Sequence, residues 1–312
     1  MTESGPVFVI LNPAAAGGRG GKLRSRLREE LDRRRVPFSL HLTEGPGHAG
    51  ELVLQARDEG SERILVVGGD GTVHEVANGL LEVPEAPPAL AVLPVGTGND
   101  FHRMVSPSRR MEDSLDVLLH GRIEAFEVGC ATFDTGSTCF VNLLGIGLDV
   151  EVLRRRSEFR RLKGLPQYLA ALTAAVVTFR PCPLRVEFLE EGDTREGPVM
   201  LGVLTVGPSI GGGFLLSPEA SPVDGYLDFT SVDPVGLGKV ARYVPKILQG
   251  THCHFPEFYF RRVRRIRLSR PDGDPFFFEL DGELMPRPTA ALEVEILTGA
   301  LPVLVPEGGS RA

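Results

Sequence analysis

The sequence lacks three features that would each place it in a different class of protein. Its four cysteines form no Cys-x-x-Cys pair, which predicts neither a zinc ribbon nor a disulfide framework and fits a reducing cytosol. The longest uncharged apolar stretch, residues 169–179, is shorter than the roughly 18–20 residues that cross a bilayer. Basic residues are not in excess, since 34 Lys and Arg against 41 Asp and Glu give a net charge of −7. This balance argues against nucleic acid as the main partner.

The composition is otherwise ordinary for a globular protein, and 312 residues are enough for two domains. In the first third of the chain, short apolar runs alternate with amphipathic stretches. We predict strands at residues 7–11, 38–42, 64–67 and 89–93, and helices at 22–35, 49–59, 72–81, 98–103 and 111–119. This β-α alternation predicts a mainly parallel sheet with helices on both faces and ligands beyond the carboxyl ends of its strands.

After residue 119 the sequence pattern changes, and extended segments rich in Val, Phe and Thr predominate. Several are predicted as single strands, among them residues 139–144, 198–206 and 258–268, and helices are expected at 148–163, 166–179 and 236–248. The fold class is therefore α/β in the first domain, residues 1–127. The C-terminal segment, residues 298–312, is a candidate for an additional part of that domain. Residues 128–297 are predicted to form a second, β-rich domain of mostly antiparallel strands.

The most informative segment runs from Val66 to Glu75, where a buried apolar strand leads into a turn of three glycines around Asp70. Glycines let backbone amides approach an anion closely, and Thr72 is placed to cap the helix that follows. An aspartate beside a phosphate would repel it, so its presence implies Mg²⁺ or a proton to be moved. The segment predicts nucleoside triphosphate chemistry.

Four other segments carry candidate site residues. Residues 12–20 (NPAAAGGRG) follow the first predicted strand and 94–101 (PVGTGNDF) follow the fourth, so both turns lie at the same sheet edge as Asp70. Residues 207–228 (GPSIGGGF…PEASPVDGYLD) and 280–283 (LDGE) lie in the second domain.

Together these segments resemble the diacylglycerol-kinase catalytic family, the bacterial lipid kinases that include the sphingosine-kinase branch. The family pattern is NPxxG, GGDGTxxEVxxGL, PxGTxND, GGG…PxAxxxDGxLD and DGE, and this chain carries all of them in that order. The resemblance implies a Rossmann-like or phosphofructokinase-like nucleotide domain followed by a β-sandwich-like domain. Two departures stand out: Ala15-Ala16 replaces the commoner Ser-Gly, and Ser221 stands where some relatives have an acid.

The resemblance also implies roles for individual residues. Asp70 would act through Mg²⁺, Asp100 with Glu127 would complete an acidic network, and Glu283 would be the general base that accepts the lipid hydroxyl proton from across an interdomain cleft. The residues implied to bind ATP are Asn12, Thr43, Gly68, Gly69, Asp70, Gly71, Thr72, Val73, His74, Glu75, Thr97 and Asn99. A second Mg²⁺ would use Asp224 with Ser221 and Tyr226, through oxygen ligands.

Several features also have a purely structural interpretation. Asp224-Gly225 and Asp281-Gly282 are typical of hairpin turns. The segment His252-Cys253-His254 is better explained by packing than by metal binding. The arginines and lysine at 154–156, 160, 161 and 163, and the arginines at 261, 262, 264, 265, 267 and 270, are either solvated faces or docking surfaces for anionic lipid.

These observations predict an ATP-dependent, Mg²⁺-using lipid kinase, cytoplasmic and peripheral to the inner face of the membrane. It would transfer the γ-phosphoryl group to a lipid hydroxyl, with diacylglycerol giving phosphatidic acid as the leading reaction. Phosphatidylglycerol, a long-chain base or an undecaprenol-like alcohol remain open as acceptors, and so does a homo-oligomer. The rival functions are an NAD-kinase-like enzyme, which PxGTxND argues against, and a nucleotide-responsive lipid-binding protein without activity.

Overall fold

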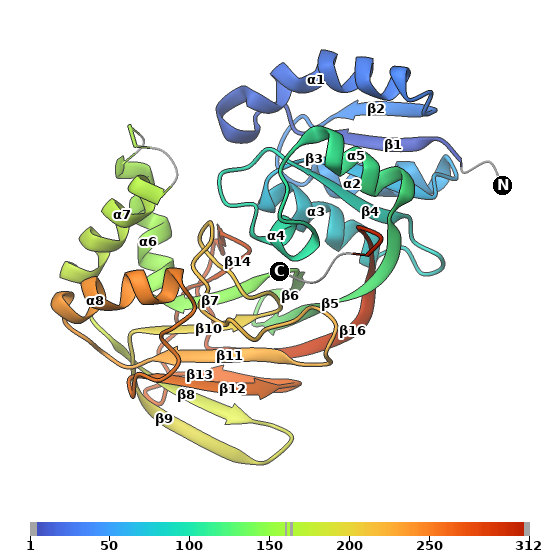
Figure 1. Cartoon of the computed structure of the whole chain (residues 1–312). Coiled ribbons are helices and arrows are strands. Elements are labelled where there is room, and N and C mark those ends of the chain that lie inside the picture. The colour runs from blue at the N-terminus through green and yellow to red at the C-terminus, as the bar shows by residue number, and fades with distance from the viewer. Residues whose placement is uncertain (1–4, 160, 163–164, 309–312) are drawn as a thin grey trace. The chain divides into compact units, whose positions relative to one another are not determined.

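The computed structural model describes residues 5–159, 161, 162 and 165–308. The chain divides into two units, Met1–Phe126 with Gly299–Ala312, and Glu127–Thr298. Two long strands, β5 (Arg122–Phe133) and β16 (Ala291–Val305), each contribute residues to both units. Figure 1 traces the chain by colour, and each unit is described by itself below.

The first unit contains a parallel sheet in the order β2-β1-β3-β4, extended by the end of β16, where Val303 pairs with Leu90. Its strands are β1 (Val7–Leu11), β2 (Phe38–Leu42), β3 (Arg63–Gly68) and β4 (Ala89–Pro94). The predicted parallel α/β arrangement is thus confirmed, and each predicted strand lies within one residue of the observed one at both ends. The apolar runs of β1, β3 and β4 could be recognised in the sequence because their central residues are buried on both faces of the sheet, whereas every residue of the edge strand β2 is half-buried.

Helices cover both faces of this sheet (Figure 1). The helices α1 (Ala15–Arg33) and α5 (Met111–His120) pack on the face that Val7, Val9 and Leu11 form. The helices α2 (His48–Asp58) and α3 (Asp70–Leu81) pack against one another and against β1 and β3, and α4 (Asp100–Val105) follows β4.

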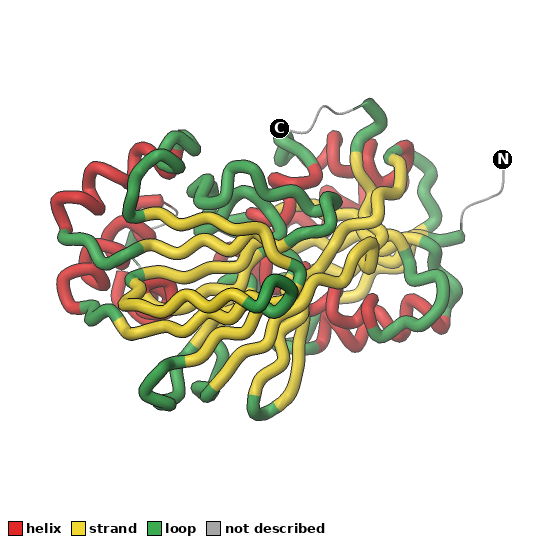
Figure 2. The backbone as a smooth tube through the Cα atoms, turned by 90° about the horizontal axis from the view of Figure 1, so that it is seen from below, coloured by secondary structure: helices red, strands yellow, loops and turns green. Residues whose placement is uncertain are grey.

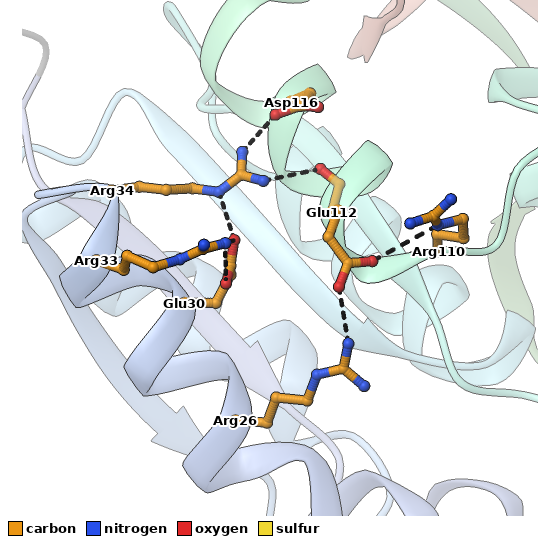
Figure 3. Close-up of polar contacts among 7 residues, drawn as sticks. All are labelled: Arg26, Glu30, Arg33, Arg34, Arg110, Glu112 and Asp116. Atoms are coloured by element: carbon orange, nitrogen blue, oxygen red, sulfur yellow. Dashed lines mark hydrogen bonds and ion pairs between the residues drawn. The ribbon is translucent and has the colours of Figure 1, made fainter.

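An ion-pair network joins α1 to α5 (Figure 3). Glu30 accepts hydrogen bonds from Arg33 at 2.6 Å and Arg34 at 2.8 Å, and Arg34 also pairs with Asp116. The two arginines lower the pKa of Glu30. Arg26 pairs with Glu112 at 2.7 Å. Because exposed pairs of this kind contribute little individually, the network orients the two helices more than it stabilises the unit.

The second unit is built from two antiparallel sheets (Figure 2). One has the order β12-β11-β10-β7-β14-β15; the other contains β16, β13, β8 and β9, with β5 and β6. Apolar side chains from both sheets form one core, for example Phe229 and Phe278 from the first and Phe188 from the second. The new strands are β6 (Gly136–Phe140), β7 (Leu143–Gly147), β8 (Cys182–Phe188), β9 (Asp193–Val199), β10 (Leu201–Thr205), β11 (Leu227–Val232), β12 (Phe258–Val263), β13 (Arg265–Ser269), β14 (Phe278–Leu280) and β15 (Glu283–Leu284).

Three segments predicted as single strands are each two. Residues 258–268 divide at Arg264, so that β12 belongs to one sheet and β13 to the other. Residues 139–144 divide at Val141 and Asn142, and residues 198–206 divide at Met200. A chain that crosses between sheets keeps its apolar alternation through the bend, which is why periodicity alone did not reveal these breaks.

Helices α6 (Leu148–Arg156), α7 (Leu165–Thr178) and α8 (Leu237–Leu248) pack beside the first of these sheets, with a 3-10 turn at Ser157–Phe159. The predicted helix at 148–163 is therefore shorter, and its last residue lies outside the described part of the chain. Among the described helices, none has both the length and the apolar character needed to span a membrane.

The cysteine prediction was wrong for one pair. Cys130 and Cys139 form a disulfide, because the β5–β6 hairpin places them directly opposite one another. Their separation of nine residues carries no motif, and only the strand register brings the two sulfur atoms together. Cys182 and Cys253 are free thiols.

Candidate functional site

The turn after β1 has an unusual backbone. Ala16, Gly17 and Gly18 have φ values of 49°, 68° and 90°, so three successive residues adopt the left-handed conformation. Glycine-rich turns of this kind allow a close approach of backbone to an anion, although the Gly18 amide itself donates to the Ala14 carbonyl at 3.2 Å. Ala16 stands at one of these positions, where the family commonly has glycine, and a side chain there is strained by about 1 kcal/mol.

Asn12 links this turn to the start of α3. Its side-chain carbonyl accepts from the Ala14 amide at 2.9 Å, and its Nδ2 donates to Thr72 Oγ1 at 3.0 Å. The prediction that Thr72 caps α3 was wrong, because the helix already begins at Asp70 with Gly69 as its cap residue. The buried Thr72 hydroxyl instead accepts from Asn12, which leaves its own proton available to donate.

The turns after β3 and β4 touch through their glycines. A Cβ built on Gly96 would lie 2.6 Å from the Cα of Gly69, and one built on Gly69 would lie 3.0 Å from the Cα of Gly96. Only residues without side chains permit this approach. The contact places PVGTGND directly beside GGDGT, as expected for segments at neighbouring carboxyl ends of a parallel sheet.

Asp70 fixes the second of these turns. Its Oδ2 accepts from the Asn99 amide at 2.7 Å and its Oδ1 from the Phe101 amide at 3.2 Å, so the carboxylate sits at the start of α4. Asp100, the residue after Asn99, is buried, and its Oδ1 lies 3.3 Å from Arg103 Nε. The negative charges of Asp70 and Asp100 both act on the Arg109 guanidinium. Sequence reasoning placed Asp70 at the nucleotide and its Mg²⁺ and missed this positioning role.

The other predicted nucleotide-binding residues occupy varied environments. Glu75 Oε2 accepts from the Ala49 amide at 3.1 Å and so holds the start of α2. The amides of Thr72 and Val73 donate to the Gly69 carbonyl within the turn. Thr43 is half-buried directly after β2, and Thr97 is exposed. All of them lie at the carboxyl-end edge of the sheet or in the first turns of α3, as predicted, whereas Glu75 has a structural partner that the motif did not indicate.

In the second unit, residues 280–283 form a two-residue hairpin between β14 and β15. Leu280 pairs with Glu283, and both Asp281 (φ 50°) and Gly282 (φ 88°) adopt left-handed conformations. The buried Asp281 carboxylate accepts from three amides, those of Val141 at 2.9 Å, Asn142 at 2.8 Å and Leu143 at 3.0 Å. The hairpin interpretation is therefore correct, and Asp281 ties the hairpin to β7 while Glu283 is exposed.

The Asp224-Gly225 turn contains several acids and an arginine. Glu127 Oε1 accepts from the Gly225 amide at 2.6 Å, and Arg262 lies 3.4 Å from Asp224 and 3.9 Å from Asp228. Burial raises the pKa of Asp228 to about 6. Burial also raises the pKa of Glu127. One buried oxygen of each of these two acids, Glu127 Oε2 and Asp228 Oδ2, has no hydrogen-bond partner among the described residues.

An apolar cavity of about 80 Å³ lies in the second unit between helices α6, α7 and α8 and the adjacent sheet. Leu148, Leu172, Phe214 and Val240 are among the side chains that line it, and Asp149 is an acidic group in its wall. Tyr168 and Tyr243 also contribute to the wall, and the rest of the lining is apolar, as in a site that contacts the apolar part of a ligand.

Comparison with known proteins decides the family. Residues 6–131 match the diacylglycerol kinase catalytic domain, and residues 142–305 match the domain described as YegS C-terminal NAD kinase beta sandwich-like. The chain belongs to the diacylglycerol kinase catalytic family. This family of lipid kinases uses ATP to transfer phosphate to an alcohol, which confirms the resemblance and the enzyme class inferred from the motifs.

The similarity extends over nearly the whole lipid kinase. The diacylglycerol kinase of Mycobacterium tuberculosis is 28% identical over 311 residues, covering 98% of this chain and 97% of the relative. That of Bacillus subtilis is 26% identical over 277 residues, 88% of each chain. A crystal structure of a diacylglycerol kinase from Bacillus anthracis has a TM-score of 0.79 at 23% identity, covering 98% of this chain and 99% of the other. That likeness confirms the fold.

The arginines 261–270 of this lipid kinase have partners within the second unit. The contacts pair Arg261 with Glu191 and Asp193, Arg262 with Asp224 and Asp228, Arg264 with the Tyr226 ring, Arg265 with Glu293 and Glu295, Arg267 with Glu187, and Arg270 with Asp272 and Asp274. This pairing reduces the charge available to a lipid surface and favours a solvated face. In the other group, Arg155 pairs with Glu151 and Arg154 stacks on Phe277, while residues 160 and 163 lie outside the described part of the chain.

The His252-Cys253-His254 segment also has a packing explanation. His252 is fully buried, contacts the Leu216 carbonyl at 3.0 Å through Nε2, and packs edge-on against Phe258. Burial lowers the pKa of His252. His254 packs on Phe255.

Proposed function

We propose that this lipid kinase phosphorylates a lipid hydroxyl with ATP, and that diacylglycerol, giving phosphatidic acid, is its acceptor. The observation that carries the choice of a lipid over a soluble acceptor is the apolar cavity, which lies in the same unit as Glu283. NAD carries charged and hydrogen-bonding groups along its length, whereas a cavity lined mainly by leucine, valine and phenylalanine favours contact with the apolar part of a lipid. Two relatives that span most of the chain are named diacylglycerol kinase.

The first unit would hold the ATP phosphates. The left-handed run at residues 16–18 and the N-terminus of α3 offer amides and a positive dipole end to an anion. The Thr72 hydroxyl adds a donor that Asn12 orients, and Thr43 and Thr97 add hydroxyl groups at the same edge. Phosphoryl transfer depends on positioning and charge neutralisation, so preorganised donors of this kind are what the reaction requires.

Asp70 and Asp100 would act together with the Mg²⁺ that accompanies ATP. Hydrogen bonds from the Asn99 and Phe101 amides fix the Asp70 carboxylate in one orientation. Mg²⁺ commonly retains several waters and uses only one or two protein carboxylates, which fits this arrangement. The bound ion would neutralise charge on the transferred phosphoryl group.

Glu283 would be the general base. Its exposed carboxylate follows a hairpin whose backbone is held by three amide contacts to Asp281, so its position is defined although its side chain is accessible. A base on a preorganised turn loses little entropy when it approaches the acceptor hydroxyl.

A second Mg²⁺ at Asp224 is compatible with the residues present. Among the described residues no three His, Cys, Asp or Glu side chains come close enough together to hold a metal ion, so ligation would rely on Asp224 with backbone oxygens of Ser221 and Tyr226. The unpartnered oxygens of Glu127 and Asp228 supply further negative charge at this turn. Such an ion would neutralise part of the negative charge of these carboxylates and stabilise the turn.

A single screen tests the function. Purified protein would be incubated with γ-labelled ATP, Mg²⁺ and, separately, diacylglycerol, phosphatidylglycerol, a long-chain base, an undecaprenol-like alcohol and NAD. We expect label in phosphatidic acid. Label in NADP would establish the NAD-kinase-like alternative, label in another lipid would replace diacylglycerol as the acceptor, and ATP binding without transfer would favour the non-enzymatic lipid-binding protein.

A further inference from the structure

Two buried acids lie between the apolar cavity and the hairpin that bears Glu283. Asp149, in the first turn of α6, lines the cavity, and Glu279, on β14, is 1% exposed. Both carboxylates face the same backbone position: a Cβ built on Gly145 would lie 2.5 Å from Glu279 Oε1 and 2.7 Å from Asp149 Oδ2. The absence of a side chain at Gly145 therefore leaves room for the two groups to meet.

The second oxygen of Glu279 holds the hairpin. Its Oε2 accepts from the Gly282 amide at 2.7 Å, one residue before Glu283. Helix α6, which carries Asp149, also packs against β14 and β15. A short path of contacts thus runs from the cavity wall through Asp149 and Glu279 to Gly282.

Two facing carboxylates in a buried site cannot both be ionised at low cost. Glu279 Oε1 finds no donor among the described residues unless one of the two acids carries a proton, and with that proton the side chains of Glu279 and Asp149 are hydrogen-bonded. Burial above all, and then the charge of Asp149, raise the pKa of Glu279 well above its ordinary value of 4.5. The charged groups with the largest effect on Glu279 are Asp149 from α6 and Asp281 from the hairpin, both acids.

We propose that Asp149 and Glu279 share one proton, and that this pair is a positioning element that sets the Asp281-Gly282 turn and with it the Glu283 carboxylate. The expected effect of this pair on turnover rests on the proposed role of Glu283. The expected effects of the pair on the turn and on the pH dependence of stability do not rest on that role.

Three variants and a control separate this role from simple packing. Glu279→Gln keeps an oxygen for the Gly282 amide and offers Asp149 a donor without needing a proton, whereas Glu279→Leu removes both contacts. Asp149→Asn removes the second charge while keeping its shape. Glu190→Gln, in the exposed turn between β8 and β9, is the matched control.

Melting temperature against pH tests the shared proton. Because the folded pKa of Glu279 is raised, its contribution is fully present below the unfolded pKa and is lost as pH rises from about 4.5 toward the folded value. Wild type and Glu190→Gln should therefore lose stability relative to Glu279→Gln as pH rises above about 4.5, and relative to Asp149→Asn by a smaller amount, because Glu279 stays buried in that variant. A difference that does not change with pH would overturn the shared proton.

Hydrogen exchange and turnover test the positioning. In Glu279→Leu, the Gly282 amide should exchange at least about tenfold faster, with protection restored in Glu279→Gln. The lipid-kinase turnover number of Glu279→Leu should fall about 10²-fold with an unchanged KM for ATP, and Glu279→Gln should recover most of it. Unchanged exchange in Glu279→Leu would overturn the positioning role. If Glu279→Leu does not fold, Asp149→Leu gives a second exchange test, because it keeps the Glu279 acceptor of the Gly282 amide but removes the partner that the pair requires. The Gly282 amide should exchange faster in this variant too, and unchanged exchange would equally overturn the positioning role. Absence of lipid transfer in the wild type would refute the proposed function. Hydrogen exchange and melting temperature would still test whether Asp149 and Glu279 share a proton and hold the turn.

Discussion

Asp281 offers the sharpest test of how this chain holds its proposed catalytic turn. In Asp281→Ala, the amides of Val141, Asn142 and Leu143 lose the buried carboxylate that accepts their hydrogen bonds. A hydrogen bond to a charged group contributes about 1.5–3 kcal/mol, and water admitted by the shorter side chain would replace part of that, so we expect a loss of about 3–5 kcal/mol. Such a loss is a large fraction of the roughly 5–15 kcal/mol that stabilises a typical protein.

The assay is urea unfolding followed by circular dichroism, with hydrogen exchange to assign the loss to the second unit. The amides of residues 141–143 should lose protection while those of β1 and β3 keep it. Asp281→Asn should lose less, because asparagine tolerates the left-handed backbone and keeps one acceptor oxygen. Asp134→Ala is the control, since Asp134 accepts one exposed hydrogen bond, from Ala290 at 2.8 Å, and should cost about 0.5–1.5 kcal/mol. Equal losses in Asp281→Ala and Asp134→Ala would refute the reasoning.

Three further predictions follow from the other sites. Ala16→Gly should stabilise the protein by about 0.5 kcal/mol, because relief of the left-handed strain exceeds the extra freedom of glycine in the unfolded chain, and a lower melting temperature would contradict this. Asp224→Ala should lower activity in a way that excess Mg²⁺ restores only in part; full activity at low Mg²⁺ would leave Asp224 with a structural role alone. Lys239 and Tyr243 lower the pKa of Glu257 to about 2, so its contribution is present above pH 4.5 and is lost as pH falls toward 2. The melting temperature of Glu257→Gln should accordingly approach that of wild type over this range, and a constant difference would refute the assignment.

The first unit could be predicted closely from the sequence because the patterns that define its strands and turns lie within short stretches of the chain. The run Val7–Leu11 is apolar at every position and is bounded by turn residues, so one short window defines the strand. The motif turns at Gly69 and Gly96 follow neighbouring parallel strands, and topology alone brings their backbones together.

The second unit was less predictable because its key contacts join distant residues. The partners of Asp281 lie 138 to 140 residues earlier in the chain, and no spacing rule connects them. The disulfide between Cys130 and Cys139 depends on the register of one hairpin. Asp-Gly correctly indicated a hairpin at 281, but at 224 it forms a bend before β11 with no described strand directly preceding it. Only the folded structure shows which acids and amides lie at each of these positions.

The most direct test of the central claim is phosphate transfer by wild type and Glu283→Gln with γ-labelled ATP, Mg²⁺ and diacylglycerol, alongside ATP binding measured by calorimetry. We expect labelled phosphatidic acid from the wild type, and from Glu283→Gln a loss of at least about 10²-fold in transfer with unchanged ATP affinity, as for removal of a general base. Wild type that binds ATP but leaves diacylglycerol unlabelled, or Glu283→Gln that transfers phosphate at the wild-type rate, would contradict the account.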